Sequence, residues 1–246
     1  MKNWYLIPLI YFRLLTGKYV ILTLKNGYKI KLRIKSTDLQ AFFNVWIIQE
    51  YNKTGYEILE NDIIIDVGAH IGLFTLYVSQ FCKKGKIFSF EPVIENYKLL
   101  LENIHLNKIE NVIIVKKAVS GENKKVKIYL SEDQAAHSTY SQGDKFIETE
   151  SISLKEIIDI NSIQKCNFLK MDCEGAEYDI LKFVPDEYFK NIVKIGMEYH
   201  FSDTKSNLLN ELKKRLQDMN YNIEQSSLSN GLGLLFAKRT DRSKQD

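Results

Sequence analysis

Short apolar runs alternate with longer periodic segments along most of the chain. The continuously apolar runs lie at 62–66 (DIIID), 86–91 (KIFSFE), 111–119 (NVIIVKKAV), 166–172 (CNFLKMD) and 191–200 (NIVKIGMEYH). In the segments between and after them, apolar residues recur every three or four positions, as at Leu209, Leu212 and Leu216. Continuous apolar runs are typical of parallel strands buried on both faces, and the periodic segments are typical of helices that cover them. The pattern predicts a doubly wound α/β domain.

Four further strands and one helix are expected in the rest of the chain. Strands are expected at 124–130 (KKVKIYL) and 146–154 (FIETESISL), on either side of a polar loop at 131–145. After a helix at 205–219, the last two strands are expected at 221–225 (YNIEQ) and 231–239 (GLGLLFAKR). Pro92 follows the second strand and fits the first turn of a helix, where its missing N–H costs nothing.

The first part of the chain has a different pattern. Residues 19–34 predict a β-hairpin, because two apolar arms flank Asn26-Gly27 and the second arm alternates apolar residues with Lys29, Lys31 and Arg33. The segment 36–51 (STDLQAFFNVWIIQEY) predicts a helix with a capping box formed by Thr37 and Gln40. We therefore expect an N-terminal extension (1–58) packed on a core domain (59–238), followed by a flexible tail (239–246).

Composition narrows the class of protein. The 246 residues are 45% hydrophobic and 26% charged, which is typical of a globular domain with a sizeable core. A formal net charge of +3 is too small to indicate a nucleic-acid partner. The three cysteines form no C-x-x-C pair, which argues against a disulfide framework or a zinc site and favours a reducing compartment such as the cytoplasm.

The first fifteen residues, MKNWYLIPLIYFRLL, are apolar and aromatic. Pro8 and Arg13 interrupt the run, and it falls short of the ~18 residues that suggest a membrane span. No small-residue cleavage site follows, so a signal peptide is not supported. Packing onto the domain is the favoured role, and contact of residues 4–15 with a membrane surface is the alternative.

Carboxylates gather just after the predicted strands. Asp66, Glu91, Asp172 and Glu174, and Glu198 all stand at or directly after the end of such a strand. Ligands of open α/β sheets bind beyond the carboxyl ends of the strands, where the strand order reverses. These acids are therefore expected to line one binding crevice.

The turn after the first of these strands, DVGAHIG (66–72), argues against a dinucleotide. A G-x-G-x-x-G fingerprint that begins at Gly68 would need glycine at position 70, where the chain has His70. A diphosphate among several carboxylates would also meet repulsion. S-adenosylmethionine carries a sulfonium, an ammonium and no phosphate, and its ribose needs an acid; Glu91 follows Asp66 by 25 residues, near the ~20-residue spacing of the ribose-binding acid in dinucleotide folds.

Five motifs in this order resemble the FkbM family of S-adenosylmethionine-dependent methyltransferases. They are DVGAHIG (66–72), FEP (90–92), AVS (118–120), LKMDCEGAEYDIL (169–181) and MEYH (197–200). The resemblance covers about residues 35–200, and the pairing of the glycine turn with D-x-E-G-x-E is fairly specific. It implies a seven-stranded, Rossmann-like methyltransferase sheet whose last strand is antiparallel, with O-methylation as the usual reaction. The acceptor-binding loops are not shared, so the resemblance does not name the acceptor.

The resemblance also implies roles for individual residues. Asp66 and Gly68 would line the methionine and ribose side, Glu91 would hold the ribose hydroxyls, the segment around Ala118 would flank the adenine, and Asp172 would lie near the sulfonium and the acceptor. The full set expected to bind the cofactor is Asp66, Gly68, Ala69, His70, Gly72, Glu91, Pro92, Ala118 and Asp172. Cys173 departs from the family pattern, in which an aliphatic residue is usual.

Catalytic roles are expected of His200, Asp172 and Glu198. Glu198 and His200 share one face of their strand by its two-residue period, and an imidazole with an ordinary pKa near neutrality suits a general base. No metal is predicted, although Asp172, Glu174, Glu198 and His200 together could also bind a divalent cation. Two other functions remain open: a nicotinamide-dependent oxidoreductase, and a binding module of the same fold that retains the cofactor without turnover. The expected acceptor is a sugar, a glycan or a small metabolite.

Overall fold

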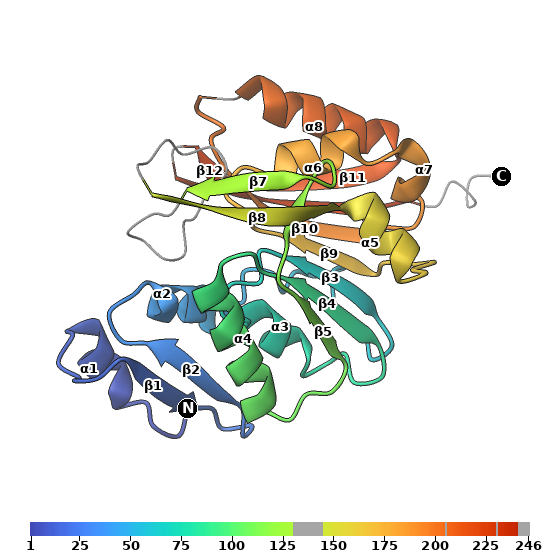
Figure 1. Ribbon diagram of the computed structural model, residues 1–246. Coiled ribbons are helices and arrows are strands. Elements are labelled where there is room, and N and C mark those ends of the chain that lie inside the picture. Colours follow the sequence, from blue (N-terminus) through green and yellow to red (C-terminus); the bar gives the residue numbers. More distant parts are fainter. Residues whose placement is uncertain (130–144, 205, 230, 241–246) are drawn as a thin grey trace.

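A computed structural model of the chain describes residues 1–129, 145–204, 206–229 and 231–240 (Figure 1). Its main feature is a seven-stranded sheet with the order β11-β12-β10-β9-β3-β4-β5. The strands are β3 (Ile63–Val67), β4 (Lys86–Phe90), β5 (Val112–Val115), β9 (Phe168–Met171), β10 (Lys194–Tyr199), β11 (Tyr221–Ser229) and β12 (Leu232–Arg239). The predicted polar loop 131–145, apart from its last residue, and most of the predicted tail lie outside the described residues.

Strand direction agrees with the expected fold. Parallel pairs join β5 to β4, β4 to β3, β3 to β9 and β9 to β10, whereas β12 is antiparallel to both β10 and β11. The sequence prediction of a seven-stranded sheet with its last strand antiparallel is therefore confirmed. The strand order reverses between β3 and β9, so the carboxyl ends of these two strands form the place where a ligand is expected.

Helices cover both faces of the sheet (Figure 1). On one face, α3 (Leu73–Val78) and α4 (Ile94–Leu106) pack together with the N-terminal elements. On the other face lie α5 (Leu154–Ile160), α6 (Glu177–Phe183), α7 (Asp186–Phe189) and α8 (Ser206–Asp218). Each face has its own apolar core, and the strand side chains alternate between them, as Ile64 and Ile65 do. Residues buried on both faces explain the unbroken apolar runs in the sequence.

The predicted hairpin is formed by β1 (Tyr19–Thr23) and β2 (Lys29–Arg33), which pair antiparallel across Asn26-Gly27. Ile30 and Leu32 are buried, as the alternation indicated. The expectation that Arg33 faces water is wrong. Its side chain is buried because two oxygens of Asp38 and the amide of Asn96 accept its N–H groups.

The helix predicted over 36–51 consists of two parts, α2 (Asp38–Phe42) and a π-helical turn η1 (Phe43–Ile48). The predicted capping box is absent, since the side chain of Thr37 caps no backbone group of the helix. Ser36 accepts the N–H of Asp38 instead. Gln49 ends the turn in the left-handed conformation, which redirects Glu50 and Tyr51 toward the sheet.

The run predicted as one strand over 111–119 divides after Val115. Ala118 belongs to a separate strand, β6 (Ala118–Ser120), which joins β7 (Lys125–Tyr129) and β8 (Phe146–Ser153) in a small sheet of order β6-β8-β7. The break falls at Lys116-Lys117, two charged residues that follow the half-buried edge strand β5. Pro92 also differs from expectation, because it precedes α4 and its N-cap Val93 rather than lying in the first turn.

The N-terminal apolar segment forms a short helix, α1 (Leu6–Tyr11), that packs on the domain through Ile10. Other side chains of this segment are exposed, including Trp4, Tyr11 and Phe12. No helix among the described residues has both the length and the apolar character needed to cross a bilayer.

Candidate active site

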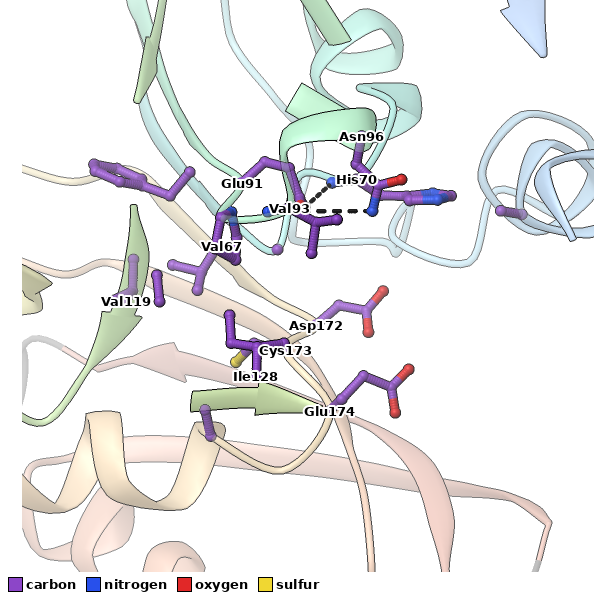
Figure 2. Close-up of a pocket in the computed structure, with 16 residues that line it drawn as sticks. Val67, His70, Glu91, Val93, Asn96, Val119, Ile128, Asp172, Cys173 and Glu174 are labelled. Carbon is purple, nitrogen blue, oxygen red and sulfur yellow. Dashed lines mark hydrogen bonds between the residues drawn. The ribbon is translucent and has the colours of Figure 1, made fainter. Parts of the chain in front are cut away.

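A cavity lies at the carboxyl ends of β3, β4 and β9 (Figure 2). One side of it is apolar and is formed by Phe90, Val93, Ala118, Val119 and Ile128. The other side is polar and is formed by Gly68, His70, Glu91, Asp172 and Glu174. Glu91 and Asp172 therefore line the same cavity, as predicted from their positions directly after β4 and β9. We refer to it as the first cavity.

The glycine turn is shaped by close approach of the protein's own backbone. Gly68 has a φ of +74°, and a Cβ there would stand 1.9 Å from the carbonyl oxygen of Asp172. Gly72 has a φ of +87°, and its Cβ would stand 2.4 Å from Leu100. Gly68 lines the cavity, whereas Gly72 serves the packing of α3 against α4 and is not among the lining residues.

Glu91 lies at the cavity with both carboxylate oxygens bonded to backbone. Oε2 accepts the N–H of His70 at 2.8 Å, and Oε1 accepts that of Val93 at 2.9 Å (Figure 2). Burial raises the pKa of Glu91 to about 7, while these hydrogen bonds and that of Asn96 oppose the rise. Oε1 also accepts the amide of Asn96 at 3.5 Å, whereas Oε2 keeps a lone pair for a further donor, which is what a ribose hydroxyl offers.

Asp66 lies beneath the cavity and does not line it. Its carboxylate is fully buried, accepts the hydroxyl of Thr75 at 2.7 Å and stands 3.2 Å from Nζ of Lys170. Lys170 also donates to the carbonyl of Gly68 at 2.8 Å and lies 3.8 Å from Asp172.

Lys170 was missed by the sequence reasoning, although a lysine inside the buried run FLKM was itself a signal, since an unpaired lysine is rarely buried.

The polar side of the cavity continues into a cluster around His200. Nε2 of His200 lies 3.3 Å from Glu174 and 3.4 Å from Glu198, and Nδ1 lies 3.3 Å from Glu177. Asp172 and Glu174 point to the same side of their segment and Cys173 to the other, as the sequence suggested (Figure 2). Glu198 and His200 also lie on one side of their segment, since Nε2 of His200 is 3.4 Å from Oε1 of Glu198.

These carboxylates change the chemistry expected of His200. Burial lowers the pKa of the imidazole, but the hydrogen bonds and charges of Glu177, Glu198 and Glu174 outweigh it and raise the pKa to about 11. The ring is therefore a cation at neutral pH and has no lone pair to accept a proton. This geometry favours an ion-pair role for His200 over the predicted role of general base.

One set of described residues has ligand atoms close enough to hold a metal ion. These atoms of Asp172, Glu174 and His200 lie within 4.8 Å of one another. Coordination by His200 would require the imidazolium to lose its proton among three carboxylates. Glu177 supports the same cluster, since its Oε1 accepts the N–H of Cys173 at 2.9 Å and lies 3.3 Å from Nδ1 of His200. Its Oε2 is buried and has no hydrogen-bond partner within the described part of the chain.

A second cavity adjoins the first. The two share Ala41, Gly68, His70, Asp172 and Glu174. The remaining wall of the second cavity comes largely from the N-terminal extension, through Thr37, Gln40, Asn44, Glu50 and Tyr51, and the sheet contributes Lys170 and Glu198. Sequence reasoning assigned residues 36–51 to packing alone and so missed this wall.

The N-terminal extension is also linked to the glycine turn. Nη2 of Arg33 lies 2.7 Å from Nε2 of His70, and Asp38 lies 3.6 Å from the same nitrogen. His70 has a φ of +50°. Its side chain is therefore directed toward the hairpin, and only its backbone N–H reaches Glu91. This arrangement supports a structural role for the His70 side chain.

The sheet order, the glycine turn and the acid after β4 together define the class: this is an S-adenosylmethionine-dependent methyltransferase domain. Residues 66–223 match the family described as the methyltransferase FkbM domain. The chain belongs to the FkbM methyltransferase family.

Known relatives agree with this assignment. The chain is 24% identical over 161 residues to "Methyltransferase 1" of Beauveria bassiana, a match that covers 56% of this chain and 65% of the relative. It is 30% identical over 166 residues to the hexuronic acid methyltransferase AglP of Haloferax volcanii, covering 64% of this chain and 65% of that protein. The matched region thus spans slightly less than two thirds of each of these relatives.

The fold is similar to that of a methyltransferase FkbM from Methylobacillus flagellatus. The TM-score is 0.53 at 16% sequence identity, and the alignment covers 80% of this chain and 53% of the other. The likeness concerns the fold, which agrees with the strand order described above.

Proposed function

We propose that this protein transfers a methyl group from S-adenosylmethionine to a hydroxyl group of a sugar, a glycan or a small metabolite. The observation that carries the proposal is the junction of two cavities at Asp172 and Glu174. One cavity has an apolar wall and Glu91, which suits adenosine. The other combines polar side chains such as Gln40, Asn44 and Glu50 with apolar ones such as Leu73 and Phe74, which suits a hydroxylated acceptor. A methyl donor and an acceptor must meet at such a junction.

The residues of the first cavity fit the cofactor. Phe90, Val93, Val119 and Ile128 would pack against the adenine, and Glu91 would accept hydrogen bonds from the ribose hydroxyls. The carboxylates of Asp172 and Glu174 offer negative charge to the ammonium and sulfonium groups. When bound, S-adenosylmethionine supplies an electrophilic methyl group, whose bond to sulfur breaks, with the electron pair left on sulfur, as the acceptor oxygen bonds to carbon.

The protein's main task is then positioning. An acceptor oxygen held in line with the methyl group at ~3–3.5 Å gains most of the available rate acceleration. The relative from Haloferax volcanii is a hexuronic acid methyltransferase, which supports a carbohydrate acceptor. Three cysteines without a disulfide are consistent with a reaction in the reducing cytoplasm.

The proposal is tested in two steps with the full chain. Calorimetry should detect S-adenosylmethionine and S-adenosylhomocysteine, and should detect no binding of NAD. Incubation with S-adenosylmethionine labelled in its methyl group should then label a carbohydrate or metabolite fraction at oxygen. Tight cofactor binding with no labelled product in any fraction would favour a binding module instead, and labelled nitrogen would contradict O-methylation.

A further inference from the structure

The second cavity is built from a segment that precedes the methyltransferase core. Gln40 and Asn44 present amides from α2 and η1, and Glu50 and Tyr51 follow the left-handed turn at Gln49. The core side of the cavity is formed by Gly68, Asp172 and Glu198. The two cavities share Asp172 and Glu174, so a ligand in one would lie next to a ligand in the other.

Tyr51 gives an independent indication that this cavity takes a polar ligand. Its side chain is 5% exposed, its ring packs edge-on against Phe74 at 5.2 Å, and its hydroxyl has no hydrogen-bond partner among the described residues. A phenylalanine would pack in the same way and would bury no unpaired hydroxyl, which is unfavourable. A bound molecule with a hydrogen-bonding group would satisfy the hydroxyl.

The charge around the cavity restricts which molecule that is. Its lining carries the carboxylates of Glu50, Asp172, Glu174 and Glu198. Of the cations nearby, Lys170 pairs with Asp66 and Asp172, and His200 pairs with Glu174 and Glu198. Glu50 makes no ion pair with any described residue. An acceptor with a carboxylate or phosphate at this end would meet the negative charge of the ionised carboxylates in the lining, which disfavours its binding.

Glu50 has the character of a proton acceptor. Burial, with the charges of Asp172 and Glu198, raises the pKa of Glu50 to about 8, against a smaller opposing effect of Lys170. A base is most effective when its pKa lies near the working pH. His200, in contrast, is held as a cation by its carboxylate partners.

We propose that the second cavity is the acceptor site, that it takes the uncharged, hydroxyl-rich end of a sugar, and that Glu50 receives the hydroxyl proton. This inference rests on the proposed O-methyltransferase function. Tyr51 and Asn44 would hydrogen-bond the sugar, and the reacting oxygen would pass its proton to the Glu50 carboxylate as the new O–C bond forms. The proton then leaves Glu50 for solvent.

Binding measurements test the location and the charge preference. Saturation-transfer NMR with S-adenosylhomocysteine present should detect methyl hexosides, and should show at least about tenfold weaker binding of the matching methyl hexuronides. Tyr51→Phe should weaken hexoside binding about three- to tenfold, as expected for one hydrogen bond, and leave cofactor affinity within twofold. The control Tyr56→Phe changes a buried tyrosine that packs on Phe236, outside both cavities, and should change neither affinity.

Several results would overturn this assignment. Equal binding of hexuronides would contradict the neutral acceptor, and absence of hexoside binding would contradict the sugar. Loss of cofactor affinity in Tyr51→Phe, with hexoside binding intact, would assign the second cavity to the methionine end of the cofactor. None of these results would contradict methyl transfer itself, which the labelling experiment reports separately.

A kinetic comparison tests Glu50. Glu50→Gln should lower kcat about 10²-fold with KM for the hexoside nearly unchanged, and NMR should show that the variant still binds the sugar. The matched control is Glu60→Gln, which alters a surface carboxylate paired with Lys84. A kcat for Glu50→Gln within threefold of the wild type would exclude Glu50 as the proton acceptor.

Discussion

Nζ of Lys170 lies 3.2 Å from Oδ1 of Asp66, and both side chains are almost completely buried between β3 and β9. The same ammonium donates to the carbonyl of Gly68 in the glycine turn. This buried ion pair joins β3 to β9 near the carboxyl ends of the two strands, where the cavity forms. Asp66 therefore acts mainly by supporting the turn from beneath.

Lys170→Met should destabilise the fold strongly. The substitution keeps the apolar bulk and leaves Asp66 buried without a cation, which costs about 3–5 kcal/mol. Denaturant unfolding should show the loss. The double variant Lys170→Met, Asp66→Asn should recover much of the stability, because no uncompensated charge remains; a double variant as unstable as the single one would contradict this account.

Glu91→Gln should weaken cofactor binding. The glutamine amide can accept only one of the two backbone N–H groups, of His70 and Val93, and its NH2 group would face the other. Loss of charge-assisted hydrogen bonds predicts an affinity for S-adenosylmethionine lower by about 1.5–3 kcal/mol, measured by calorimetry. Equal affinity in variant and wild type would remove Glu91 from the cofactor site.

His200→Gln should lower stability in a pH-dependent way. The pKa of His200 is raised to about 11 in the folded protein from an ordinary value of 6.5, so binding of a proton to this ring stabilises the folded state. This contribution is complete below pH 6.5 and is lost as pH rises toward 11. Thermal unfolding should therefore show a large difference between variant and wild type at pH 7 that shrinks by pH 10. A difference that grows with pH would mean that the ring is neutral in the native cluster.

Glu50→Gln should have the opposite effect on stability. The pKa of Glu50 is raised from 4.5 to about 8, so the charged form is disfavoured in the folded protein. The carboxyl group of Glu50 therefore destabilises the fold least below pH 4.5, and the destabilisation grows as the pH rises toward 8. The variant should therefore be more stable than the wild type at pH 8.5, and the difference should be smaller at pH 5. A less stable variant at pH 8.5 would show that the carboxylate has a cationic partner.

Gly68→Ala should prevent normal folding or open the end of the sheet. The added Cβ would stand 1.9 Å from the carbonyl oxygen of Asp172, a backbone atom that cannot turn aside. Gly27→Ala is the matched control, because Gly27 also has a positive φ, +93°, but has nothing within 4 Å of its Cβ position. The control should lose about 1 kcal/mol in thermal unfolding. Similar losses in both variants would argue against backbone crowding at Gly68.

The sequence predicted the sheet well because its signals are local. Unbroken apolar runs such as Ile63–Ile65 indicate burial on two faces, and Asn26-Gly27 indicates a hairpin. The hydrophobic pattern did not predict the division between α2 and η1 or the break after Val115. Both depend on contacts with neighbouring elements, which a local pattern shows only weakly. The positions of Glu91, Asp172 and Glu174 at one cavity were predicted correctly, since residues that follow parallel strands converge in space.

The chemistry of individual side chains was harder to predict. The ordinary pKa of histidine suggested a base at His200, but Glu174, Glu177 and Glu198 surround it from two elements and hold the proton. The burial of Asp66 beneath the turn depends on Lys170, more than one hundred residues away in the chain. Such contacts arise only when the strands meet, so local periodicity cannot report them.

The contact of Arg33 with His70 has a practical consequence for anyone who shortens this protein. A fragment that starts at residue 59 would keep every motif shared with the family and still lack the partner of the histidine in the glycine turn, together with one side of the second cavity. If a new selectivity is sought on the proposed assignment of the second cavity, Gln40 and Asn44 are the positions to exchange, with Arg33 and Glu50 retained.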